Sequence, residues 1–309
     1  KGERLVMEAN REYWGGAPKL KQVIYYPIAE DTTRMAAVRT GEVDIAYGIL
    51  PEEIAGLKVM PQLEVFSVLS NDCVGVIAYL EGDKPRIKSK VRKAMLMAID
   101  REKIVSKILQ GVGAVARSVV SAALPFFNPN LTPYPYDPKQ AKALLTEAGY
   151  PDGFSSNLVV PSGFYPKDAE ITQAVAAYLK QIGINLEVRL VEQSSAWPLR
   201  RVPYEFFYSG GAVMNMDGDM AFSRDYMPET SREKYNNPEV TRLIKAARAS
   251  SKQDQRRELY RQVQAAIWED MPRIQIHDVG DVWAMSKRVK NWQPRPDKTI
   301  VLKDASVEG

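Results

Sequence analysis

Very few residues of this chain could carry covalent or metal chemistry. The sequence of 309 residues holds one cysteine, Cys73, and one histidine, His277. A structural zinc site takes four ligands, mostly cysteine and histidine, so a Cys₂His₂ or Cys₄ site cannot be built. A nucleophile activated by histidine would have to use His277 itself. Both residues fall in strands that we expect to be buried, which favours packing, and we predict no catalytic residue, no metal site and no cofactor.

The segment from Tyr208 to Asp219 is the best candidate for a binding site. It reads Tyr-Ser-Gly-Gly-Ala-Val-Met-Asn-Met-Asp-Gly-Asp. Two glycines follow a predicted strand, and glycine lets a backbone approach a ligand closely. The predicted ligand contacts in this segment are Tyr208, Gly210, Gly211, Ala212, Val213, Met214, Asn215 and Asp217.

Some of these residues also have a structural interpretation. Met214 and Met216 could fill irregular gaps in the core, as methionine often does. Asp217 and Asp219 could cap a loop. Two tryptophans could either stack on a ligand or pack inside the protein: Trp197 and Trp283.

Two further pairs are candidates of the same kind. Gly48 and Ile49 follow a predicted strand and could face a ligand or form a plain turn. Arg200 and Arg201 could clamp a carboxylate or a phosphate, although a solvated charged turn is the more favoured interpretation.

The composition is that of an ordinary globular protein. Hydrophobic residues make up 45% and charged residues 26% of the chain. No apolar run approaches the roughly 18 residues that indicate a membrane span. The net charge of +4 is small and the two signs are interspersed, so nothing favours nucleic acid as a partner.

Strands and helices alternate along the chain, which predicts an α/β protein with mixed sheets. Runs rich in valine, isoleucine and tyrosine predict strands at Arg4–Glu8, Lys21–Pro27, Val43–Tyr47, Leu63–Val68, Cys73–Tyr79, Ser155–Val160, Ile184–Leu190, Tyr204–Ser209, Arg273–His277, Asp281–Ser286 and Thr299–Leu302. Capping residues and apolar periodicity predict helices at Thr33–Thr40 after Asp31 or Thr32, from Lys90, from Asp100, from Asp137-Pro138, at Ala169–Ile182, from Asn237-Pro238 and after a cap at Asp254. Residues 112–136 form a long irregular stretch.

Four groups of segments follow one another in a recognisable order. They are Asn10–Gly16 with Thr32–Arg34 and Gly41–Ile45, Val91–Ala94 with Ala98–Val105, Tyr136–Pro138 with Ala141–Leu145 and Ala148–Gly153, and Asn237–Val240 with Arg256–Tyr260 and Trp268–Pro272. In this order and spacing the chain resembles the extracytoplasmic solute-binding proteins of ABC importers, in the family that takes peptides, nickel and opines (family 5). The resemblance covers essentially the whole chain.

The resemblance implies a type II periplasmic-binding-protein fold with two α/β lobes that close on a solute. We expect residues 1–86 in lobe I, 87–272 in lobe II and 273–309 back in lobe I, with crossovers near Asp83–Ile87 and Met271–Ile276. The first recognisable segment resembles the middle of the family pattern. We therefore expect an incomplete first lobe, with exposed sheet edges and apolar surface that favour self-association.

The two candidate binding segments differ in residue type from the usual sequences of the family. The family's usual segment carries a tryptophan where Gly211 stands, and an aspartate for a peptide's amino terminus near Met214 or Asn215. Because a buried ammonium without a carboxylate is costly, we expect no free peptide amine to bind in the usual way. Peptide-binding relatives have asparagines in place of Gly48 and Ile49, so this wall is more apolar here.

The resemblance implies a transport protein in the periplasm, or on the cell surface of a Gram-positive organism. Its expected partners are a peptide-like or other small organic solute, an ABC permease and its ATPase, with no nucleic acid and membrane contact only through the permease. A nickel chelate that brings its own ligands stays open as the solute. The alternatives are a chaperone-like or signalling module on the same fold, and a hydrolase, for which no local acid–nucleophile constellation is found.

Overall fold

The computed structural model describes residues 4–200 and 203–308, and these residues fall into two compact units. Unit 1 combines Lys1–Val68 with Gly280–Gly309, and unit 2 is Leu69–Val279. Two strands, β4 (Leu63–Ala78) and β9 (Arg273–Ser286), contribute residues to both units. These two units are compact bodies of the chain and are not the same as the expected lobes. The assignment of lobes, with crossovers near Asp83–Ile87 and Met271–Ile276, stays a prediction.

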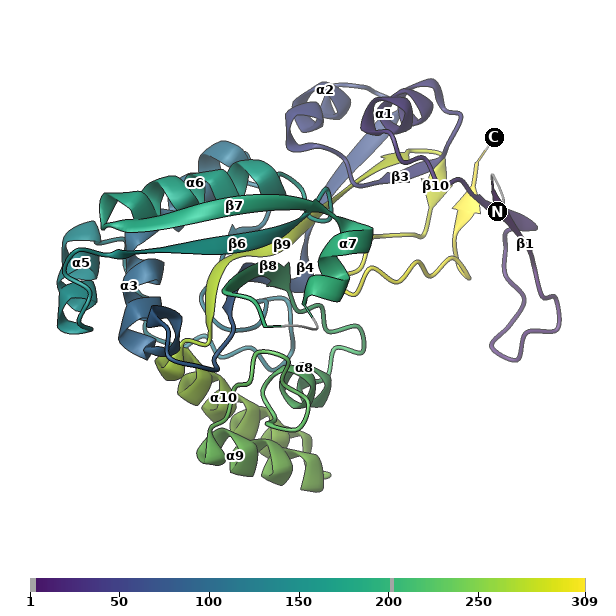
Figure 1. Cartoon of the computed structure of the whole chain (residues 1–309). Coiled ribbons are helices and arrows are strands. Elements are labelled where there is room, and N and C mark those ends of the chain that lie inside the picture. Colours follow the sequence, from purple (N-terminus) through teal and green to yellow (C-terminus); the bar gives the residue numbers. More distant parts are fainter. Residues whose placement is uncertain (1–3, 201–202, 309) are drawn as a thin grey trace. The chain divides into compact units, whose positions relative to one another are not determined.

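A mixed sheet forms the centre of unit 2 (Figure 1). Its strand order is β9, β4, β8 (Phe206–Gly210), β6 (Phe154–Ser162) and β7 (Ile184–Glu192), with β5 (Ala114–Val115) paired to β9. Strand β8 runs antiparallel to β4 and parallel to β6. The three aromatic residues that open β8 are fully buried, so this strand is fixed on both faces: Phe206, Phe207 and Tyr208.

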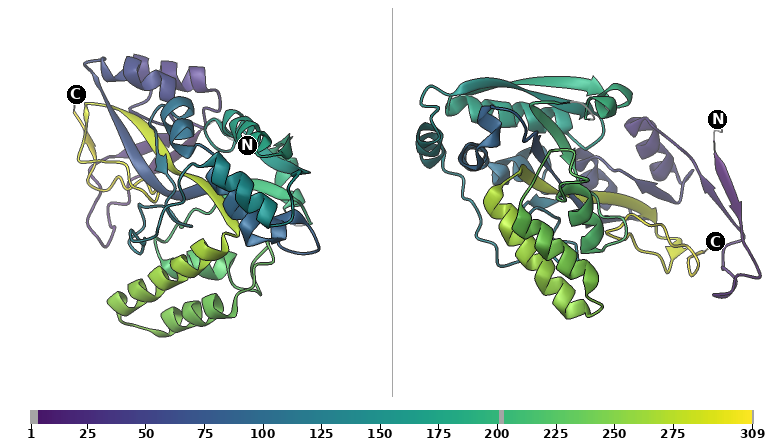
Figure 2. Two further views of the ribbon diagram at one scale, coloured as in Figure 1. Left: turned by 90° about the vertical axis from the view of Figure 1, so that its left-hand side faces the viewer. Right: turned by 60° about the horizontal axis from the view of Figure 1, so that its bottom comes forward.

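Helices surround this sheet. They are α3 (Ser89–Ala98), α4 (Arg101–Lys103), the π-helical turn η3 (Ile104–Ile108), α5 (Pro138–Glu147), α6 (Asp168–Gln181), α7 (Gln193–Leu199), α8 (Gly218–Asp225), α9 (Pro238–Ala249) and α10 (Gln253–Asp270), with the short 3₁₀ turn η2 (Pro85–Ile87). Helices α9 and α10 lie side by side in both views of Figure 2. None of the described helices has the length and apolar character needed to cross a membrane.

Unit 1 has smaller elements. A two-stranded ribbon of β1 (Leu5–Glu8) and β2 (Gln22–Tyr25) precedes α1 (Asp31–Thr40), β3 (Ile45–Tyr47), η1 (Pro51–Glu53) and α2 (Ile54–Lys58). Strand β3 pairs with the end of β9, and β10 (Val289–Lys290) pairs with β11 (Ser306–Val307). The apolar centre of these last strands contains Trp283, Met285, Val289 and Trp292.

Local sequence signals place most helix starts correctly. Asp137 accepts a hydrogen bond from the amide of Gln140 at the start of α5, and Asn237 caps α9 in the same way. Two cap predictions are wrong. Glu30 is the N-cap of α1 and Lys252 that of α10, so Asp31, Thr32 and Asp254 do not cap. Asp31 and Asp254 lie in the first helical turn, where a carboxylate also stabilises the amide ends.

Three strand predictions need correction. The predicted strands Leu63–Val68 and Cys73–Tyr79 form one strand, β4, and Arg273–His277 and Asp281–Ser286 form one strand, β9. No strand occupies Thr299–Leu302. There the amide of Thr299 donates to Oδ1 of Asp297 in a local turn, which removes this donor from any ladder.

Candidate functional site

The end of β8 is held by side chains from elements far away in the sequence. The amide of Gly210 donates to Oη of Tyr165 at 2.9 Å, and the amide of Gly211 donates to Oδ1 of Asp72 at 2.8 Å. A Cβ atom on Gly210 would lie 2.2 Å from Oδ1 of Asp72 and 2.8 Å from Oη of Tyr165. Only glycine therefore fits at this position without a shift of both neighbours.

The chain continues alongside β4 after the strand ends. The amide of Val213 donates to the carbonyl of Asn71 at 3.4 Å, and Nδ2 of Asn71 donates to the carbonyl of Val213 at 3.0 Å. The carbonyl of Ala212 accepts from Nη1 of Arg224 at 3.0 Å. Because these backbone groups already have partners in the protein, fewer remain to pair with the main chain of a ligand.

The four residues that follow have different surroundings. Met214 is 56% exposed, which rules out a core role, whereas Met216 packs partly buried against the core of unit 2. Asn215 is exposed, and its Oδ1 accepts from the amide of Asp217. Asp217 caps α8 and pairs with Nη2 of Arg256 at 2.7 Å. Its role as a loop cap is thus present, and its contact with a ligand stays a prediction.

A network of buried charges lies against Gly211. Nη1 of Arg273 lies 3.2 Å from Oδ2 of Asp225, and its Nη2 lies 3.2 Å from Oε1 of Glu233. Arg200 donates to the same Glu233 oxygen at 2.7 Å. A Cβ atom on Gly211 would stand 3.3 Å from both Nη1 of Arg273 and Oδ2 of Asp225. The network therefore occupies the space into which a larger side chain at this position would point.

The arginines keep the carboxylates of this network ionised. Burial alone would raise the pKa of Asp225, but Arg273 and Arg224 outweigh it and lower that pKa to about 2. Burial would likewise raise the pKa of Glu233, yet Arg273 and Arg200 lower it. The buried side chain of Arg200 corrects its interpretation as a solvated turn. Its neighbour Arg201 lies outside the described residues.

The lone histidine and cysteine are both buried. Oη of Tyr208 and Nε2 of His277 lie 3.5 Å apart, and burial lowers the pKa of His277 to about 4. Burial raises the pKa of the Cys73 thiol well above its ordinary value. Burial also raises the pKa of Asp278, to about 7, and the negative charge of Asp72 adds to this effect. Within residues 4–200 and 203–308, no three His, Cys, Asp or Glu side chains are grouped so that they could hold a metal ion.

The candidates in unit 1 form a fixed turn. Gly48 has a φ of 74°, in the left-handed region that favours glycine. The amides of Gly48 and Ile49 both donate to the carbonyl of Val282, at 3.0 and 3.3 Å, and Arg34 donates to the carbonyl of Gly48 at 2.8 Å. Ile49 is buried. The turn is therefore built by unit 1 itself, and contact of either residue with a solute stays a prediction.

Both candidate tryptophans pack against other aromatic side chains, Trp283 fully and Trp197 partly buried. Trp283 is buried against Tyr47 and Trp292. Trp197 packs against Phe164 and Phe207. These contacts favour the packing interpretation of both side chains.

Sequence reasoning missed Tyr165, Asp72 and the network around Arg273. Asp72 belongs to the polar run Ser70–Asp72, which lies in the buried part of β4. That run was the one available signal, because a polar group in a buried strand needs a partner.

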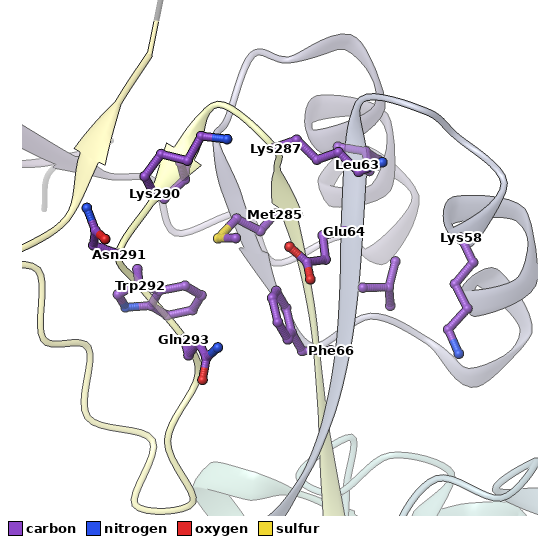
Figure 3. Close-up of a pocket in the computed structure, with 12 residues that line it drawn as sticks. Lys58, Leu63, Glu64, Phe66, Met285, Lys287, Lys290, Asn291, Trp292 and Gln293 are labelled. Carbon is purple, nitrogen blue, oxygen red and sulfur yellow. The ribbon is translucent and has the colours of Figure 1, made fainter.

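Unit 1 also has a cavity of about 570 Å³, which Figure 3 shows. Twelve residues line it: Lys58, Leu63, Glu64, Val65, Phe66, Met285, Lys287, Val289, Lys290, Asn291, Trp292 and Gln293. It was not predicted, because its lining comes from two segments that are more than two hundred residues apart.

Comparison with solved structures shows the fold. The periplasmic binding protein DppA of Helicobacter pylori, solved with the peptide STSA, superimposes with a TM-score of 0.86 at 24% identity, over 99% of this chain and 61% of that one. A dipeptide-binding protein of Pseudoalteromonas, solved with Met-Leu, gives a TM-score of 0.84 at 25% identity, over 99% and 62%. The fold is the type II periplasmic-binding-protein fold that the resemblance implied.

Sequence comparison leads to the same group of proteins. The glutathione-binding protein GsiB of Salmonella paratyphi A is 28% identical over 312 residues, which cover 96% of this chain and 60% of the relative. GsiB of Escherichia coli O1:K1 matches with the same identity and coverage. The chain thus spans about 60% of the length of these curated relatives.

The sequence pattern of a whole family also matches this chain. The family is that of the bacterial extracellular solute-binding proteins, family 5, and its pattern matches residues 1–232. The chain belongs to this family.

Proposed function

We propose that this chain captures a small organic solute for an ABC importer, as part of its substrate-binding protein, and catalyses no reaction. The family match over residues 1–232 is the observation that carries the proposal. The expected partners are the permease and ATPase of the importer. The expected location is the periplasm, or the cell surface of a Gram-positive organism. Solute would bind at the end of β8 and be released unchanged.

The candidate segment supports a rigid, glycine-lined contact surface. The amides of Gly210 and Gly211 are fixed by Tyr165 and Asp72, so this part of the backbone is ordered before a solute arrives. Preordered contacts reduce the entropy lost on binding. Contacts from Gly48 and Ile49 in unit 1 are part of the proposal.

The relatives suggest peptide-like solutes. GsiB is named for glutathione, and the solved relatives hold the peptides STSA and Met-Leu. Met214 or Asn215 stands where the aspartate of the peptide-binding relatives is expected, so neither of these two positions offers a carboxylate to a free amine. We therefore propose a peptide-like solute whose binding does not depend on a free amino terminus.

Native mass spectrometry before and after mild denaturation tests the proposal, because it reports any solute that co-purifies. Titration calorimetry with glutathione, Met-Leu and N-acetylated Met-Leu then compares candidate solutes. We expect saturable binding of at least one compound, with N-acetylation of Met-Leu having little effect, and recovery of the solute unchanged. Absence of both a retained solute and any titration signal would contradict solute capture, and a chemically altered solute would contradict the claim that no reaction is catalysed.

A further inference from the structure

One buried carboxylate lies at the centre of the charge network beside the candidate segment. Oε1 of Glu233 accepts from Nη2 of Arg200 at 2.7 Å and from Nη2 of Arg273 at 3.2 Å. The backbone carbonyl of Glu233 accepts from the amide of Leu80 at 2.8 Å. Glu233 is thus fixed by its own backbone, and its side chain binds two arginines through one oxygen.

The branch through Arg200 leads to the end of β8. Nη1 of Arg200 donates to Oγ of Ser209 at 3.3 Å, and this hydroxyl donates to the carbonyl of Gly210 at 3.3 Å. Within residues 4–200 and 203–308, no carboxylate other than that of Glu233 lies within ion-pair distance of Arg200. Loss of the charge on Glu233 would therefore leave a buried cation without a counter-charge, which is costly.

The branch through Arg273 leads to the residues after β8. Nη1 of Arg273 lies 3.2 Å from Oδ2 of Asp225. Asp225 accepts from Nε and Nη2 of Arg224 at 3.0 and 2.9 Å, and Nη1 of Arg224 donates to the carbonyl of Ala212 at 3.0 Å. The guanidinium of Arg224 is therefore held by a carboxylate while it binds the backbone of the candidate segment.

The two branches start at one oxygen of Glu233 and end at two carbonyls of one short segment, those of Gly210 and Ala212. The amides of Gly210 and Gly211 are bound by side chains outside this network. The carbonyls and the amides of the segment thus have separate partners. Because hydrogen bonds that involve charged groups are stronger than neutral ones, the network adds order that the partners of the amides do not supply.

We propose that Glu233 is a positioning residue for the solute site, which holds the backbone of Gly210–Ala212 through Arg200 and Arg273. The proposal rests on the proposed function, which assigns the solute to the end of β8. Glu233 is buried, and in this role it needs no contact with the solute. An ordered segment loses less entropy when a solute binds, so loss of the charge on Glu233 lowers affinity without removing a solute contact.

Amide hydrogen exchange of the solute-free protein tests the effect on the segment. Glu233→Gln removes the charge and keeps the size of the side chain. We expect exchange at Gly210 and Gly211 to become about tenfold faster, the ratio that corresponds to loss of one hydrogen bond to a charged group. Low concentrations of urea should not accelerate this exchange further, because the opening is local.

Glu205→Gln is the matched control. Glu205 pairs with the buried Arg86 at 2.8 Å, and in the described part of the chain neither residue is hydrogen-bonded to Gly210–Ala212. We expect local exchange at Gly210 and Gly211 to stay unchanged in this variant.

A milder variant breaks only one link. Ser209→Ala removes the hydroxyl between Arg200 and Gly210 and leaves the ion pair of Arg200 with Glu233 in place. We expect a smaller acceleration of local exchange at Gly210 than in Glu233→Gln. This variant also provides the test if Glu233→Gln does not fold, and unchanged exchange at Gly210 would then overturn the proposal.

Titration calorimetry with glutathione and Met-Leu measures the effect on binding. We expect Glu233→Gln to weaken the binding that the unchanged chain shows by about tenfold, in step with the loss of order, and Glu205→Gln to leave it unchanged. If the unchanged chain binds neither compound, the proposed function fails, and the exchange data alone decide whether Glu233 orders the segment.

Two results would overturn the proposal. In Glu233→Gln, exchange at Gly210 and Gly211 could become faster only through an opening that urea accelerates, which would show that Glu233 stabilises the whole fold and has no separate effect on the segment. Local exchange could also become faster while the affinity stays the same, which would show that order in this segment does not matter for the solute.

Discussion

The amide of Gly211 donates a hydrogen bond to Oδ1 of Asp72 at 2.8 Å, and the same oxygen lies 2.2 Å from the place where a Cβ atom on Gly210 would stand. One carboxylate oxygen therefore fixes the end of β8 and also excludes every side chain from Gly210. The neighbouring glycine is less restricted, because a Cβ atom on Gly211 would come no closer than 3.2 Å to another atom.

This difference predicts unequal effects of two matched substitutions. Gly210→Ala forces Asp72 and Tyr165 to move, so we expect it to lower the free energy of unfolding by about 1–3 kcal/mol, the range for overpacked sites. Gly211→Ala meets the ends of longer side chains and should lower it less. Urea denaturation of both variants measures the difference. In an Asp72→Ala background the effect of Gly210→Ala should shrink, and equal effects in both backgrounds would show that the two residues are not coupled.

The buried charge network gives a second prediction. Arg273 lies between Asp225 and Glu233, and its removal leaves both carboxylates with fewer cations in a buried place. We expect Arg273→Met to lower the free energy of unfolding by about 3–5 kcal/mol, as for other broken buried ion pairs. Arg242→Met removes an exposed pair with Glu239 and is the matched control, with little change expected. Thermal unfolding measures the stability of both variants. An equal loss of stability in the two would contradict this account.

Elements with local signals could be predicted from the sequence, and elements with distant partners could not. Asp137 and Asn237 mark the starts of α5 and α9, because a cap and its amides lie within a few residues. At Ser70–Asp72, by contrast, the sequence indicated a break between two strands, whereas the structure has the single strand β4 there. Two of its polar groups are bonded from far away, since the carbonyl of Ser70 accepts from Ser121 and Nδ2 of Asn71 donates to the carbonyl of Val213.

The candidate site follows the same rule. Gly210 and Gly211 could be recognised because glycines after a strand are a local signal. The residue that restricts them, Asp72, is 139 positions away from Gly211 in the chain. Met214 could not be assigned between the core and the surface, because its exposure depends on how the segment after β8 lies against β4.

Two neighbouring buried residues predict opposite dependences of stability on pH. Burial raises the pKa of Asp278 to about 7, so the folded protein keeps a proton that the unfolded chain loses near pH 4. Stability from this group falls as pH rises from about 4 to 7, by about 1.4 kcal/mol per pH unit. Burial lowers the pKa of His277 to about 4. Below about pH 6.5 the histidine of the unfolded chain binds a proton, whereas the histidine of the folded protein stays neutral until about pH 4. This group removes stability as pH falls through the same range.

The two effects oppose each other between about pH 4 and pH 6.5, so single substitutions should reveal each one. In Asp278→Asn the histidine acts alone, and the free energy of unfolding should fall as the pH is lowered from 6.5 to 4. In His277→Gln the aspartate acts alone, and stability should rise over the same change. Urea titrations at several pH values measure both. Parallel curves for the two variants would contradict the assignment of either pKa.

The last prediction concerns Met214, which is one of the two positions, with Asn215, at which we expect the aspartate of the family's peptide-binding pattern. Met214 is 56% exposed, so a charged side chain can replace it without entering the core. Met214→Asp places a carboxylate after the glycines of β8, where it could pair with the amino group of a bound peptide. We expect the variant to bind Met-Leu about threefold to tenfold tighter than the unchanged chain, the range for a partly solvated ion pair. N-acetylated Met-Leu, which lacks the charge, should bind both proteins equally, and Val59→Asp, at a side chain of unit 1 that is 80% exposed, serves as the matched control. Equal gains for the free and the acetylated peptide would show that the new carboxylate does not contact the amine, and that the amino end of the solute lies elsewhere.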